Sequence, residues 1–113
     1  MKIVNRTQFL AMPPGVIFST GEKWAFFEWR MKGETSGTND FFYTSLDWSA
    51  FDYGSTDEFL DKLDECLDKG SSLPLMFDGI ERDGMYDDKA LFAVMEYKDI
   101  LAFVATMFKA TPA

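Results

Sequence analysis

The period of the apolar pattern changes along this chain, and the change limits the folds open to it. Between residues 16 and 48 apolar side chains largely alternate with others, which is typical of β-strands. Over 56–69 and 97–109 they recur instead at i, i+1, i+4, i+7 and i+8, which predicts one apolar stripe on each of two helices. Strands grouped together, with the helices set apart from them, favour an α+β fold with an antiparallel sheet.

The alternating region predicts a three-stranded meander, with strands over 16–19, 23–32 and 40–48. Turns are expected at 20–22 and across the polar stretch that follows Lys32. A fourth strand is expected over 89–96. On the second strand, the face expected to be core carries Ala25, Phe27, Trp29 and Met31. The opposite face of this strand is apolar at the start of the strand and charged toward its C-terminal end, where Glu28, Arg30 and Lys32 lie.

The stretch 56–69 gives the strongest helix prediction in the chain. Ser55 and Thr56 are N-cap candidates, and Glu58 stands three residues after Ser55 as in a capping box. Gly70 supplies the C-terminal stop. The stripe expected to face the core consists of Phe59, Leu60, Leu63, Cys66 and Leu67.

A closing helix is expected over 97–109, and a short helical turn is expected near the N-terminus. Asn5 or Thr7 can cap that turn, and Pro13 must end it because it pushes the preceding residue out of the α region. The closing helix carries the same apolar spacing, again expected to face the core, in Ile100, Leu101, Val104, Met107 and Phe108.

The composition fits one domain over residues 1–113. Hydrophobic residues make up 47% of the chain and include 12 Phe, enough to bury a core, and no linker-like stretch divides it. We therefore expect an antiparallel sheet of three to four strands, formed by the meander and a late strand, with two main helices and the short N-terminal turn. No apolar leader follows Met1 and no run is long enough to cross a bilayer, which predicts a cytoplasmic protein without membrane contact.

The excess of negative charge lies in the middle of the chain. Residues 47–88 carry 13 acidic and 3 basic side chains, whereas the whole chain has a net charge of −8. An acidic field of this kind repels phosphate backbones and attracts basic surfaces. Direct binding to nucleic acid is therefore disfavoured, and a partner protein with a basic surface is favoured.

The sequence gives no signature of catalysis. It contains no histidine, which removes the commonest general base and zinc ligand. Cys66 lies on an apolar stripe near a helix C-terminus, so we expect a buried structural thiol rather than a nucleophile. The segment 78–88 resembles a calcium loop, but aligning Gly84 with the required glycine leaves both end ligands missing. We predict no enzyme activity, no metal and no cofactor.

The outer face of the helix over 56–69 is the main candidate site. Asp57, Asp61, Asp64 and Asp68 stand at i, i+4, i+7 and i+11, and Glu58 and Glu65 lie beside them. Like charges at these spacings repel, so helix stability alone does not select the line. A solvated surface that keeps the protein soluble is the alternative. The stripes expected to be core do not accommodate all of Trp24, Phe26, Phe41 and Phe103. These aromatics suggest a patch for a partner, for which we select Trp24 and Phe26. A thicker core with a helix on each face of the sheet is the alternative.

Three segments of the chain resemble small uncharacterised proteins of bacteriophages and prophages. These segments are Thr7–Phe18, Asn39–Tyr43 and Ala90–Glu96. The resemblance implies a bacterial cytoplasm and a protein that binds a host protein, as inhibitors of CRISPR and restriction systems do. It transfers no functional residue to this sequence.

These observations predict a non-enzymatic protein-binding module of a phage or prophage. Its acidic helix would meet a basic host protein, including one that binds nucleic acid, in the manner of a nucleic-acid mimic. Two alternatives stay open: a small carboxylate-based enzyme or cation- or ligand-binding domain, and a virion or assembly component that forms homo-oligomers.

Overall fold

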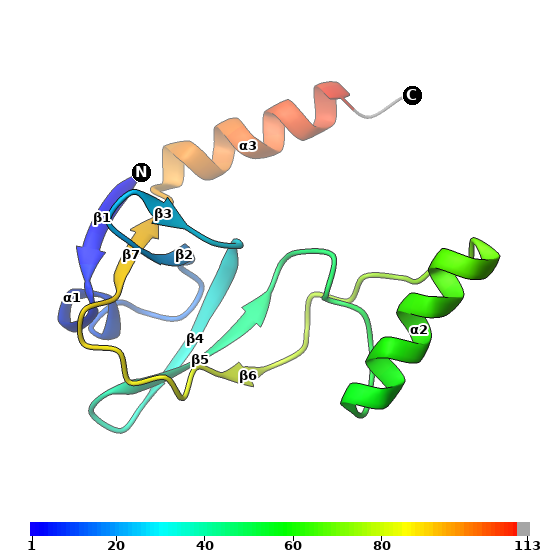
Figure 1. Ribbon diagram of the computed structural model, residues 1–113. Coiled ribbons are helices and arrows are strands. Elements are labelled where there is room, and N and C mark those ends of the chain that lie inside the picture. The colour runs from blue at the N-terminus through cyan, green and yellow to red at the C-terminus, as the bar shows by residue number, and fades with distance from the viewer. Residues whose placement is uncertain (111–113) are drawn as a thin grey trace.

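The computed structural model describes residues 1–110, and it has an α+β fold (Figure 1). The helices are α1 (Arg6–Leu10), α2 (Thr56–Lys69) and α3 (Tyr97–Ala110). The strands are β1 (Lys2–Asn5), β2 (Ile17–Glu22), β3 (Ala25–Phe26), β4 (Arg30–Ser36), β5 (Asp40–Ser45), β6 (Glu81–Arg82) and β7 (Leu91–Val94).

All seven strands belong to one antiparallel sheet. Its order is β1-β7-β2-β4-β5-β6, with β3 paired to the far end of β2. The late strand β7 lies between the two N-terminal strands, so that Val94 faces Lys2 on one side and Phe18 on the other. The α+β class and the antiparallel sheet were predicted, but the sheet has more strands than the three to four expected.

The expected strand over 23–32 is divided in two. Its start, at Lys23 and Trp24, forms the turn of a tight hairpin, and Trp24 has a positive φ of 76°. The expected turn at 20–22 is instead the end of β2. Gly21 pairs there with Phe26 so closely that a Cβ would lie 2.1 Å from the Ala25 carbonyl oxygen. Strand β3 ends after two residues, at Phe26, and the next strand, β4, begins at Arg30.

The break between β3 and β4 also overturns the predicted core face. Phe27 is 66% exposed, whereas Lys32 is fully buried, because residues 27–29 do not continue the strand alternation. The Lys32 ammonium donates hydrogen bonds to the Gly33 carbonyl at 3.1 Å and to the Thr35 hydroxyl at 3.0 Å. It also lies 5.7 Å from the centre of the Phe9 ring. Burial lowers the pKa of Lys32 from its ordinary value.

Four phenylalanine rings form the centre of the core. Phe9 stacks on Phe92 at 4.1 Å between ring centres, and Phe18 and Phe41 approach Phe9 at 4.6 and 5.0 Å. All four side chains are fully buried. Phe9 is brought there by α1, whose capping box joins Asn5 and Gln8; of the two expected caps, Asn5 and Thr7, the structure has Asn5. Aromatic packing of this kind is the main source of stability in the sheet body.

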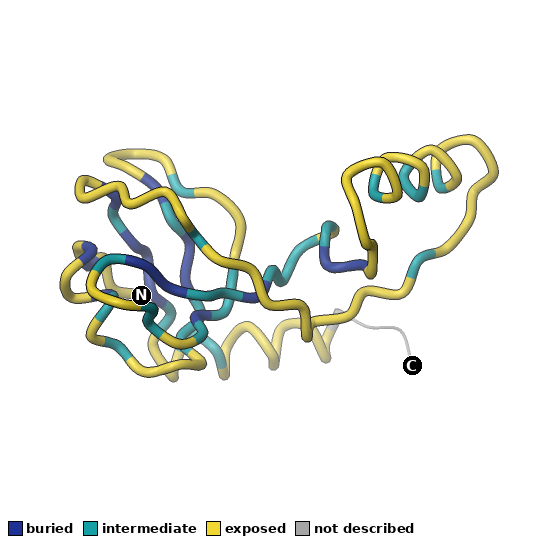
Figure 2. Tube along the Cα trace, turned by 90° about the horizontal axis from the view of Figure 1, so that it is seen from below, coloured by how far each residue is buried: buried dark blue, intermediate teal, exposed yellow. Residues whose placement is uncertain are grey.

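The two long helices form where they were predicted, but they do not pack on the core. No residue of α2 is buried, and beyond Ile100 the described side chains of α3 are exposed (Figure 2). The radius of gyration is 16.0 Å, against about 13 Å for a compact domain of this length. The expectation that both apolar stripes face the core is therefore wrong. Cys66 is likewise half-buried rather than buried.

Candidate functional site

Local signals at both ends of α2 determine its length. The Ser55 hydroxyl accepts a hydrogen bond from the Glu58 backbone N–H at 3.2 Å, and the Glu58 carboxylate accepts one from the Gly54 N–H at 2.9 Å. Gly70 ends the helix in the left-handed conformation. Asp57 and Glu58 in the first turn and Lys69 in the last turn suit the helix dipole.

An aromatic cluster outside the main core holds α2. The Phe59 ring stacks on Phe51 at 5.2 Å and meets Tyr53 at 4.9 Å and Trp48 at 6.0 Å. Phe51 is only 6% exposed, whereas Trp48 is 61% exposed. The Met76 N–H donates to the Ala50 carbonyl at 2.6 Å, which ties the segment after α2 to the same cluster. These contacts turn Phe59 toward the cluster and leave the opposite side of the helix in solvent, while Leu60 and Leu67 of the apolar stripe stay 51% and 82% exposed.

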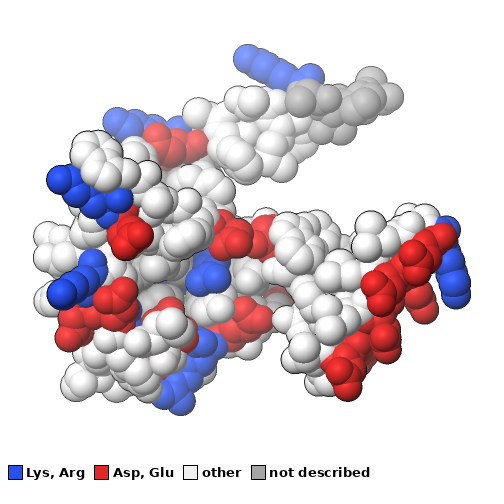
Figure 3. All heavy atoms as spheres, viewed as in Figure 1, with Lys and Arg blue, Asp and Glu red and all other residues white. Residues whose placement is uncertain are grey.

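The outward side of α2 carries the predicted carboxylates, and all are exposed. Figure 3 shows acidic atoms along one edge of α2, with uncharged atoms on the side toward the sheet body. The structure thus brings together on one face six of the eight predicted site residues. They are Asp57, Glu58, Asp61, Asp64, Glu65 and Asp68. We call this surface the acidic face.

Few positive charges offset the acidic face. Lys62 pairs with Glu58 at 3.2 Å and also donates to the Asp52 carbonyl, so its ammonium is directed to the base of the helix. The Gly54 N–H and then Lys62 lower the pKa of Glu58 from its ordinary value. Within residues 1–110, no ion pair involves Asp57, Asp61, Asp64, Glu65 or Asp68. The acidic face is thus largely unneutralised by its own chain.

The two predicted aromatic site residues lie elsewhere. Trp24 is at the β2–β3 turn and 90% exposed, and Phe26 is half-buried in β3. Figures 1 and 2 place this hairpin at the opposite end of the molecule from α2. The aromatics that contact α2 are instead Trp48, Phe51 and Tyr53, which pack on Phe59 on the side away from the acidic face and which the sequence prediction missed. Their close spacing in the acidic segment after β5 was the available signal.

A cleft of about 370 Å³ opens beside the aromatic cluster. It lies between the end of β5, the segment that follows it, and residues 76–81. Its lining combines the carboxylates Asp52, Asp78 and Glu81 with the rings of Phe51 and Tyr53. Negative charge next to aromatic faces suits a cationic group such as the side chain of Lys or Arg.

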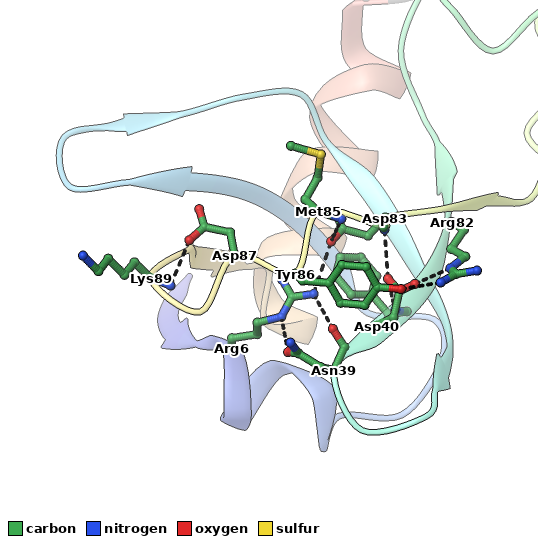
Figure 4. A network of polar contacts seen from close by, with 11 residues as sticks. Arg6, Asn39, Asp40, Arg82, Asp83, Met85, Tyr86, Asp87 and Lys89 are labelled. Carbon is green, nitrogen blue, oxygen red and sulfur yellow. Dashed lines mark hydrogen bonds and ion pairs between the residues drawn. The ribbon is translucent and has the colours of Figure 1, made fainter.

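The expected charged loop over 78–88 forms a structural network instead of an open site (Figure 4). Arg6 donates to the Asn39 carbonyl at 2.7 Å and pairs with Asp83 at 3.2 Å, both side chains of the pair being almost wholly buried. Arg82 pairs with Asp40 and also donates to the Tyr86 hydroxyl. Charge pairing in this network joins α1, the β4–β5 turn and the loop.

Asp40 is the most strongly perturbed acid of this network. Burial raises its pKa, but hydrogen bonds from Arg82, the Gly84 N–H and the Phe41 N–H outweigh that effect and bring the pKa to about 2.

Across the part of the chain that the structure describes, no group of three or more His, Cys, Asp or Glu side chains is arranged to hold a metal ion.

Comparison with known protein families, with curated proteins and with solved structures gave no match for this chain. None of the described helices is long and apolar enough to cross a membrane. The geometry of the acidic face and of its surroundings is therefore the basis for a functional proposal.

Proposed function

We propose that this protein is a non-enzymatic binding module whose acidic face binds a basic surface of a partner protein. The observation that carries the proposal is the line of exposed carboxylates on a helix that stands clear of the sheet body. A helix in this position can enter a groove that a helix packed flat on a sheet cannot reach.

The spacing of the carboxylates supports a groove that binds nucleic acid. Neighbours at i and i+4 are separated by about 6 Å along the helix axis, comparable with the spacing of phosphates along a strand. Lysine and arginine side chains that neutralise phosphates can therefore meet Asp57, Asp61, Asp64 and Asp68 in their place. With the resemblance to phage and prophage proteins, the partner we propose is a nucleic-acid-binding protein of a bacterial host, including a defence protein.

Capture from a nuclease-treated bacterial lysate tests this proposal. The parent chain, immobilised at low salt, should retain a basic protein that added duplex DNA or single-stranded RNA displaces. A variant with Asp57, Asp61, Asp64 and Asp68 changed to Asn should retain at least tenfold less of it. The difference should shrink as salt screens the parent.

A matched control separates the acidic face from overall charge. Changing Glu22, Glu28 and Glu34 to Gln and Asp88 to Asn removes the same four charges from exposed positions outside α2. This control should bind as the parent does. Equal binding by all three proteins would show that the acidic face is only a solvated surface.

The cleft beside the aromatic cluster supports a second candidate, a domain that binds a small organic cation. Carboxylates and rings in one concave site are the observation that favours it. Titration with arginine should raise the melting temperature if the folded state alone binds the ligand. An unchanged melting temperature with arginine would count against this candidate.

A further inference from the structure

Helix α3 presents an uncharged line of side chains that stays exposed among the residues that the structure describes. Residues 100–108 contain no charged side chain. Tyr97 is 76% exposed, Leu101 53%, Val104 41% and Phe108 78%. At about 100° per residue these four positions, i, i+4, i+7 and i+11, fall within roughly 60° of the helix circumference. We call this line the α3 stripe.

Ion pairs attach the start of α3 to the N-terminus of the sheet body. The Met1 ammonium pairs with Asp99 at 2.5 Å and with Glu96 at 3.2 Å, and the Asp99 carboxylate accepts a hydrogen bond from the Glu96 N–H at 2.9 Å. Beyond its first turn the helix runs away from the sheet (Figures 1 and 2). The helix is therefore held in a defined direction with its apolar side in water.

The exposed area is large enough for a stable interface. Tyr97 and Phe108 of the α3 stripe are each about three-quarters exposed, which corresponds to roughly 230–390 Å² at about 150–250 Å² per ring. Leu101 and Val104 add to this area. The total is of the same order as the roughly 800 Å² that each partner buries in a standard interface.

The distribution of charge favours a second copy as the occupant. Two molecules of net charge −8 repel each other wherever their acidic surfaces approach. In the described part of α3 the charged residues are Lys98, Asp99 and Lys109, none of which falls in the α3 stripe. An approach through the α3 stripe therefore brings no charged side chain of α3 into the centre of the contact.

We propose that α3 is a dimerisation helix, with the α3 stripes of two copies packed antiparallel about a twofold axis. Such an isologous contact is self-complementary, so one patch serves both copies. Val104 is near the middle of the helix and therefore lies closest to its own copy across the axis. The resulting dimer carries two acidic faces on one particle, a property that the proposed binding function does not require.

Sedimentation velocity of the full chain tests the proposal. The parent should form a dimer that strengthens with added salt, because salt screens the repulsion between two acidic molecules. Val104→Asp should weaken dimerisation at least tenfold, and Ala102→Asp, on the polar side of the same helix, should leave it unchanged. A parent that is monomeric at every concentration, or equal effects of the two substitutions, would overturn the proposal.

A cysteine experiment keeps the test decisive if Val104→Asp fails to fold. In a Cys66→Ser background, Val104→Cys should oxidise rapidly to a covalent dimer, since the twofold axis brings the two thiols together. Ala102→Cys should not. Similar rates for the two cysteines would rule out the antiparallel contact.

The outcome is independent of the proposed binding function. The variant with four Asn residues on the acidic face should still dimerise, and Val104→Asp should still capture a basic partner. Salt acts in opposite directions on the two interactions, so failure of one leaves the other measurable.

Discussion

The sheet body and the two long helices place their apolar residues in opposite environments. In the body, Phe9, Phe18, Phe41 and Phe92 are fully buried against one another. In α2 and α3, by contrast, many residues with the same apolar character are exposed, as Leu67 is at 82% and Phe108 at 78%. The body therefore accounts for most of the stability, and the helices present surfaces to other molecules.

The two helices also differ from each other. Both have 14 residues and the same spacing of apolar positions, but α2 carries six acidic side chains and α3 carries one. The apolar spacing predicts that a helix forms without indicating which surface it meets. The residues between the apolar positions make the difference. In α2 they are acidic and suit a basic partner, whereas α3 has few charged residues and suits self-association.

The largest expected effect separates the body from the helices. Phe9→Ala should lower the free energy of unfolding by about 3–5 kcal/mol, because it removes a ring from a closed aromatic core and leaves a cavity. Leu67→Ala should change it by less than about 0.5 kcal/mol, as is usual for surface positions. Urea denaturation of both variants measures the difference. Comparable losses would mean that α2 contributes to the core after all.

The helix boundaries were predictable because their signals are local. Ser55 and Gly70 lie next to the residues that they cap, so 56–69 was predicted correctly from both ends. Strand β1 was missed because its four residues gain their pairing from β7, about ninety positions away. The expectation that the apolar stripes of α2 and α3 pack on the core was wrong for the same reason. Which surface a helix contacts depends on residues far away in the sequence.

Part of the candidate site could also be predicted. The line from Asp57 to Asp68 follows directly from helical spacing, and the structure shows those side chains exposed. The neighbourhood of Trp48, Phe51 and Tyr53 could not be predicted, because it depends on how the chain turns back between β5 and α2 to reach Phe59. Trp24 was correctly identified as a residue that the core does not need, since it is 90% exposed. Its expected position beside α2 was wrong, because the pairing of β3 with β2 places Trp24 in a hairpin far from that helix (Figure 1).

A smaller effect concerns charge within the body. Asp40→Asn should cost about 1–3 kcal/mol near neutral pH by weakening hydrogen bonds to a buried carboxylate. The folded-state pKa of Asp40, about 2, lies below its unfolded value, which is about 3.9. Its stabilising effect is thus complete above about pH 4 and is lost as the pH falls toward about 2.

Urea denaturation of the parent and of Asp40→Asn between pH 7 and pH 2 checks this expectation. The two curves should converge below about pH 4. The exposed Asp88→Asn substitution provides the control and should follow the parent throughout. A constant difference between the parent and Asp40→Asn down to pH 2 would contradict the low pKa.

The smallest expected effect is the stability of the variant with Asn at 57, 61, 64 and 68. Like charges at i and i+4 or i and i+3 repel by a few tenths of a kcal/mol per pair. Removing them should stabilise α2 slightly, less the favourable interaction of Asp57 with the helix N-terminus. The free energy of unfolding in urea should therefore equal or slightly exceed that of the parent, and low salt should enlarge the difference. Because capture of a basic partner should fall at least tenfold in the same variant, binding and stability would change independently, as expected of a surface that serves recognition. A loss above about 1 kcal/mol would instead assign these carboxylates a structural role and weaken the contrast between the body and α2.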